Sequence, residues 1–127
     1  LRAAALCLKA KDYQSSYGYY QSLLKVEQSN EYRKGLVSAA VGLKDHEKII
    51  DAAGQYLKHA KDHDAALALA YAYEARAASK TGRQKLEDIN AAVEAYQLAL
   101  KINPKSTKAQ EKIPELKIES IRLKKGI

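Results

Sequence analysis

Apolar side chains recur along this chain at intervals of three and four residues, with polar side chains between them. The clearest series are Tyr13, Tyr17, Tyr20 and Leu24, and Ile89, Val93, Tyr96 and Leu100. This spacing places the apolar side chains on one face of an α-helix, whereas a half-buried strand would alternate every second residue. The helix-forming residues Ala, Leu, Lys, Glu and Gln are also abundant. The pattern therefore predicts an all-α chain.

The polar segments between these series predict where the helices begin and end. We expect seven helices, over residues 1–10, 13–27, 31–43, 46–59, 64–80, 86–102 and 106–124. Asp12 and Asp45 directly precede helices and can cap them by accepting hydrogen bonds from free N–H groups. Gly82 is expected to take a left-handed conformation past the end of the fifth helix, and Pro114 to kink or restart the seventh. The short connections predict antiparallel neighbours.

Three segments of the sequence, 11–29, 44–62 and 87–105, can be aligned with one another. The acidic residues Asp12, Asp45 and Asp88 then fall in register. The columns that follow them are expected to pack, and they contain Tyr13, His46 and Ile89, then Ser16, Ile49 and Ala92, then Tyr20, Ala53 and Tyr96, then Leu23, Tyr56 and Ala99. The interval from Asp45 to Asp88 is longer than the interval from Asp12 to Asp45, and we place the extra residues in 77–85. They form either a tolerated surface insertion or a basic arm.

The third segment, with Ala92, Tyr96 and Ala99 before Asn103-Pro104, resembles the second helix of a tetratricopeptide repeat. The resemblance covers about residues 1–105, with repeats at about 1–29, 30–62 and 63–105 and a capping helix at about 106–124. It implies an α-solenoid of three helical hairpins that forms a right-handed superhelix, in which stacking buries faces that one hairpin cannot bury alone. We expect 1–127 to be a single domain. We also expect it to be a fragment of a larger protein, because it starts at Leu1 and lacks methionine.

The resemblance also implies a function. First helices of such repeats line a concave groove that holds a peptide or helix of a partner protein, so we expect a protein–protein interaction scaffold or adaptor. The groove positions in this sequence are Arg2, Ala5, Lys34, Ser38, Val41, Leu67, Tyr71 and Ala75. Co-chaperones of this family grip a carboxylate with Lys, Asn and Arg, but Ala5, Ser38 and Leu67 stand where such residues are expected, which disfavours that ligand. Self-association stays open.

Charge adds a second hypothesis. The net charge is +7, and most of it lies beyond residue 100. The expected basic surface comprises Lys80, Arg83, Lys85, Lys117, Arg122, Lys124 and Lys125. The alternative function is therefore an RNA- or anionic-surface-binding helical domain, while a solvated end cap and a docking site for an acidic protein stay open. We disfavour nucleic acid because Lys and Glu alternate there without aromatic residues for stacking.

Other classes of function find little support in the sequence. It contains no Gly-rich phosphate loop, no G-x-S-x-G and no H-E-x-x-H, so we expect neither an enzyme nor a cofactor. His59 and His63 flank Asp62, but a helix should end between them, which disfavours a metal site. With 46% apolar and 29% charged residues the chain suits a soluble globular protein, and no apolar run approaches the roughly 20 residues of a membrane span. No signal peptide is visible and the compartment is undetermined.

Overall fold

The computed structural model describes residues 2–126, and every regular element in that range is an α-helix. The helices are α1 (Arg2–Lys9), α2 (Tyr13–Val26), α3 (Asn30–Leu43), α4 (His46–Leu57), α5 (His63–Ala78), α6 (Gly82–Ile102) and α7 (Thr107–Gly126). They confirm the expected all-α chain of seven helices. The helices belong to two compact units, unit 1 (Leu1–Ala60, α1 to α4) and unit 2 (Lys61–Ile127, α5 to α7).

In unit 1 each helix packs on the next, and α3 also contacts α1. Aspartates fix two of the helix starts. The side chain of Asp12 accepts from the Ser15 amide at 3.3 Å, and that of Asp45 accepts from the Lys48 amide at 3.2 Å. Each satisfies one of the amides that a helix start leaves without a partner. The predicted caps of α2 and α4 are confirmed.

Tyrosine rings and glycines form the contact between α2 and α3. Tyr20 is buried, and a Cβ added at Gly35 would lie 2.3 Å from its Cζ atom. A Cβ added at Gly42 would lie 2.2 Å from Cδ1 of Tyr13. Both distances are far below van der Waals contact, so only glycine lets the rings lie this close to the α3 backbone.

The replacement Gly42→Ala is therefore expected to destabilise unit 1. Overpacking lowers the free energy of unfolding by about 1–3 kcal/mol. The higher helix propensity of alanine offsets about 1 kcal/mol of this loss. The matched control is Gly18→Ala in α2, where an added Cβ meets nothing within 4 Å. Chemical denaturation should show a lower free energy of unfolding for Gly42→Ala and an unchanged or higher one for Gly18→Ala. Equal effects would contradict the close packing.

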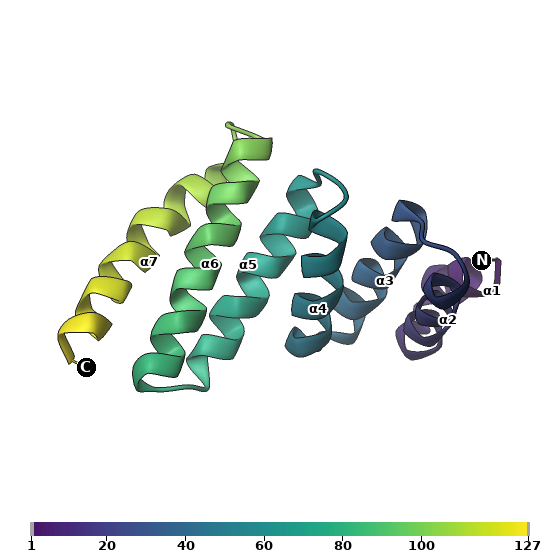
Figure 1. Cartoon of the computed structure of the whole chain (residues 1–127), viewed down its shortest axis with the longest axis horizontal. Helices are drawn as coiled ribbons and strands as arrows, with labels where there is room; N and C mark the ends of the chain where they lie inside the picture. The colour runs from purple at the N-terminus through teal and green to yellow at the C-terminus, as the bar shows by residue number, and fades with distance from the viewer. Residues whose placement is uncertain (1, 127) are drawn as a thin grey trace. The chain divides into compact units, whose positions relative to one another are not determined.

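In unit 2, α5, α6 and α7 lie side by side and alternate in direction (Figure 1). Asp62 caps α5 by accepting from the Ala65 amide at 3.1 Å. The expected packing positions on α6 are buried, namely Ile89, Ala92, Tyr96 and Ala99. Many contacts in this unit are made by alanine, which allows helix axes to approach closely.

The start of α6 differs from expectation. α5 ends at Ala78 and α6 begins at Gly82, so the extra residues expected in 77–85 lengthen α6 at its N-terminus. Gly82 has a positive φ of 60° as expected, but it opens α6 instead of closing α5. Consequently Asp88 does not cap α6 as Asp12 and Asp45 cap their helices. It lies inside the helix, and its side chain is buried.

Pro114 does not restart the last helix, because α7 runs through it from Thr107 to Gly126. Proline removes one intrahelical hydrogen bond and crowds the preceding turn. Ala109 and Leu116 are buried on either side of it, and this packing stabilises the helix across the interruption.

Candidate functional site

The expected groove residues of unit 1 lie on exposed faces of α1 and α3. Arg2 and Ala5 are exposed on α1. Lys34, Ser38 and Val41 follow one another at intervals of four and three residues, so they share one face of α3. All three are exposed, and the side chain of Val41 is 44% exposed. We call Lys34, Ser38 and Val41 the α3 face.

Unit 2 carries the remaining groove residues on one face of α5. Leu67, Tyr71 and Ala75 are spaced four residues apart, and we call them the α5 face. Leu67 and Ala75 are half-buried, whereas Tyr71 is 59% exposed. A large aromatic side chain thus stands out between two smaller apolar ones, an arrangement that offers contact area to a ligand.

A carboxylate beside the α5 face joins all three helices of unit 2. The Tyr96 hydroxyl on α6 donates to Oε2 of Glu74 on α5, and Nζ of Lys112 on α7 donates to Oε1 at 3.1 Å. Tyr96 is 1% exposed. Burial, and then the hydrogen bond to Glu74, raise the pKa of the Tyr96 phenol. The same carboxylate raises the pKa of Lys112. We call Glu74, Tyr96 and Lys112 the Glu74 cluster.

A second ionic cluster lies at the turn between α5 and α6. Arg76 donates through Nε and a terminal nitrogen to the two oxygens of Asp88, at 3.0 and 2.8 Å, and Nζ of Lys80 lies 3.0 Å from the same carboxylate. The side chain of Asp88 is only 5% exposed. The Arg76 hydrogen bonds, together with Lys80, lower the pKa of Asp88 despite its burial. We call Arg76, Lys80 and Asp88 the Asp88 cluster.

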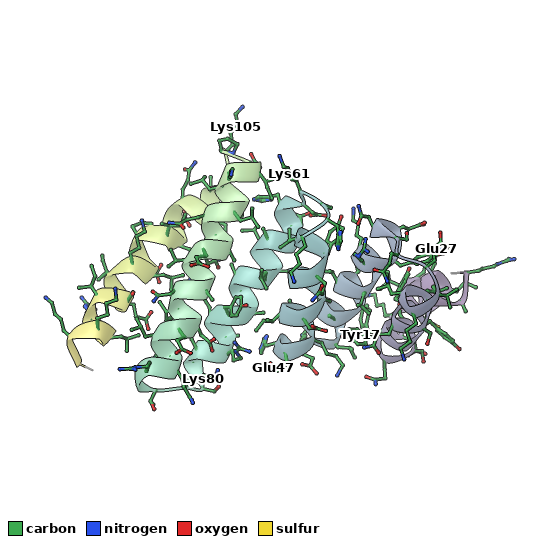
Figure 2. All side chains as sticks on the ribbon, in the orientation of Figure 1. Tyr17, Glu27, Glu47, Lys61, Lys80 and Lys105 are labelled. Atoms are coloured by element: carbon green, nitrogen blue, oxygen red, sulfur yellow. The ribbon has the colours of Figure 1, made fainter. Side chains whose placement is uncertain are left out.

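Two residues of the expected basic surface form ion pairs within unit 2. Lys80 belongs to the Asp88 cluster, and Figure 2 shows it at the α5–α6 turn. Lys85 pairs with Glu119 of α7 at 3.8 Å. That contact brings the start of α6 beside the C-terminal half of α7. Exposed Arg83, Lys117, Arg122, Lys124 and Lys125 therefore belong to this end of unit 2.

A serine, a histidine and an aspartate also meet in unit 2. Nε2 of His63 lies 2.7 Å from Oγ of Ser106, and Nδ1 lies 3.3 Å from Oδ1 of Asp64. The sequence gives no hint of this pairing, and His63 is half-buried rather than solvated. Ser106 is 5% exposed and Asp64 is 96% exposed. A buried nucleophile and a fully hydrated carboxylate do not suit hydrolysis, so the contact joins the starts of α5 and α7.

Two open clefts also lie on the surface of the described residues. One lies between α1 and α2, has a volume of about 300 Å³ and is lined by Ala3, Ala4, Tyr19, Ser22, Leu23 and Val26. The other lies between α6 and α7, has a volume of about 470 Å³ and is lined by Asn90, Val93, Glu94, Lys117, Ser120, Ile121 and Lys124. Of the residues that line the second cleft, the sequence indicated only Lys117 and Lys124 as candidate site residues, and it placed Val93 in the apolar helical series. The pairing of α6 with α7 was predictable, but the facing side chains depend on helix rotation.

Within residues 2–126 no group of three or more His, Cys, Asp or Glu side chains is placed to hold a metal ion. None of the helices there is both long and apolar enough to cross a membrane. In comparisons with known proteins, no family model matches the sequence and no curated protein matches it.

Proposed function

We propose that this chain is a protein–protein interaction module of the tetratricopeptide type, an α-solenoid whose α1, α3 and α5 carry the partner-binding positions. Support comes from the three aligned segments, the aspartate caps of α2 and α4, and the packing columns, of which Ser16, Ile49 and Ala92 are all buried. The hairpins of this array would be α1–α2, α3–α4 and α5–α6, and α7 would cap it.

The observation that carries the proposed function is the exposure of Tyr71. Soluble proteins expose single apolar residues routinely, but Tyr71 stands at a position that the repeat register assigns to ligand contact. Tyrosine is among the residues that contribute most at protein interfaces, because it offers a large area at low entropy cost. Its neighbours Leu67 and Ala75 extend the apolar face. The ligand of this face is an apolar peptide or one side of an amphipathic helix.

The hydrogen bonds that hold α5 in place beside the α5 face support the same proposed function. The Glu74 cluster connects α5 to α6 and α7, so the helix that presents Tyr71 is tied to both other helices of unit 2. A surface that is ordered before binding loses less entropy on association. Within unit 1, the α3 face also exposes the apolar side chain of Val41.

The proposal is tested with peptides that are selected from a display library for binding to the wild-type chain. The variant Tyr71→Ala should weaken binding of a selected peptide by at least about tenfold. The control Tyr19→Ala removes another exposed tyrosine, 48% exposed on α2, and should leave affinity unchanged. Calorimetry at low and high salt checks both variants. Binding that resists Tyr71→Ala and disappears at high salt would contradict the proposal and favour the basic surface.

A further inference from the structure

The cleft between α6 and α7 has a basic edge and a mixed floor, in which apolar side chains lie beside a hydrogen bond from Ser120 Oγ to Asn90 Oδ1 at 2.8 Å. Val93 of α6 is buried and Ile121 of α7 is 55% exposed, so the floor offers apolar area to a ligand. Lys117 and Lys124 line the α7 wall. They are seven residues apart, which is two helical turns or about 10.5 Å along the axis. Ile121 lies between them on the same face.

The charges of α7 are divided between its two sides. Glu115 and Glu119 pair with Lys112 and Lys85, at 3.9 and 3.8 Å. Among residues 2–126, Lys117 and Lys124 form no ion pair, nor does Glu94 on the opposite wall. Lys117, Lys124 and Glu94 together therefore give the cleft a net charge of +1. The exposed apolar area of Ile121 beside this basic edge complements a ligand that is both apolar and acidic.

The way in which the helices of this chain pack indicates that a helical ligand suits a pair of antiparallel helices. In unit 1, α3 contacts both members of the α1–α2 pair. In unit 2, α7 packs on α6 and reaches α5 through the Lys112–Glu74 hydrogen bond. A helix laid along a helix pair is thus the arrangement that recurs here, and a ligand helix can present carboxylates at the same seven-residue interval as the lysines.

We propose that the α6–α7 cleft binds an acidic amphipathic helix of a partner protein. Its apolar side chains lie against Val93 and Ile121, and two carboxylates seven residues apart pair with Lys117 and Lys124. This site is separate from the α5 face and does not depend on the proposed function of that face. Nucleic acid, an anionic membrane and a second copy of the chain are the competing occupants.

A defined probe tests the proposal on the full chain. The probe is a capped, alanine-rich helical peptide of about 20 residues, long enough for marginal helicity in water, with Glu at positions i and i+7 and Leu at i+3 and i+4. A second peptide carries Lys in place of both Glu residues. We expect the acidic peptide to bind and the basic one not to bind, with amide shift changes in 15N spectra at Val93, Ile121 and their neighbours.

Two double variants with the same change in net charge provide the control. Lys117→Glu/Lys124→Glu reverses the cleft lysines, and Arg122→Glu/Lys125→Glu reverses two exposed charges of α7 that do not line the cleft. The first should weaken the acidic peptide about tenfold, since two attractive pairs become repulsive, and should gain affinity for the basic peptide. The second should change affinity by less than about twofold.

Several outcomes would overturn the proposal. One is absence of binding by the acidic peptide at millimolar concentration. Another is equal weakening by both double variants, which would point to a general electrostatic ligand such as RNA or an anionic vesicle. Shift changes on adding unlabelled chain, in place of peptide, would point to self-association. Tyr71→Ala should leave peptide binding unchanged, so failure here and failure of the α5 face are separate results.

Discussion

Replacing Tyr96 by alanine is expected to lower the free energy of unfolding by about 3–5 kcal/mol, as large-to-small changes of buried aromatic residues do. The side chain is 1% exposed in the middle of α6, so its removal leaves a cavity. It also removes the hydroxyl that donates to Glu74. The loss should appear in urea denaturation followed by circular dichroism.

Tyr96→Phe separates the two contributions. It keeps the ring and removes only the hydroxyl, so we expect a cost of about 1–2 kcal/mol. Glu74 still accepts from Lys112 in this variant. If Tyr96→Phe cost as much as Tyr96→Ala, the hydroxyl rather than the packing would dominate. If neither variant changed stability, the burial of Tyr96 would be contradicted.

The raised pKa of Tyr96 also predicts how stability depends on alkaline pH. In the unfolded chain the phenol ionises near pH 10, whereas in the folded chain burial and the bond to Glu74 keep it protonated to higher pH. Its contribution is therefore complete below about pH 10 and is lost as pH rises further. Wild type should lose stability above about pH 10 more steeply than Tyr96→Phe.

Neutralising Asp88 is expected to have the second largest effect. Asp88→Asn removes the negative charge that pairs with Arg76 and Lys80, at a site where the carboxylate is 5% exposed. Breaking a buried ion pair costs about 3–5 kcal/mol. Because the two cations are 25% and 30% exposed, water compensates in part, and we expect about 2–3 kcal/mol.

The control for Asp88→Asn is Glu87→Gln, which removes a negative charge from the exposed neighbouring residue and should change stability by less than about 0.5 kcal/mol. The pKa of Asp88 is lowered in the folded chain. Its contribution is therefore present above about pH 4, the unfolded value, and is lost as pH falls through the lowered one. The gap between wild type and Asp88→Asn should close in acid. A gap that persists unchanged would contradict the ionic origin.

Local features of the fold were predictable from the sequence. Apolar spacing predicted seven helices, and Asp12 and Asp45 cap the helices that follow them. These signals act within a few residues, so they depend little on the rest of the chain. The aligned packing column of Tyr20, Ala53 and Tyr96 is likewise buried at all three positions.

Features that depend on contacts between helices were not predictable. The sixth helix was expected to begin at residue 86, but α6 extends back to Gly82, and the Asp88 carboxylate is held by Arg76 of α5 and by Lys80 of the following turn. Glu74 and Lys112 are far apart in sequence, and no local pattern marks them as partners. The facing walls of the α6–α7 cleft are set by how the two helices are rotated, which hydrophobic spacing defines only coarsely.

The most direct test of the central proposal, that the α5 face binds a partner protein, is to map a display-selected peptide on the chain by NMR. At 14.1 kDa the labelled protein suits a 15N titration. The proposal predicts shift changes concentrated at Leu67, Tyr71 and Ala75, and their loss in Tyr71→Ala. Shift changes that leave α5 unaffected, and persist in Tyr71→Ala, would contradict it.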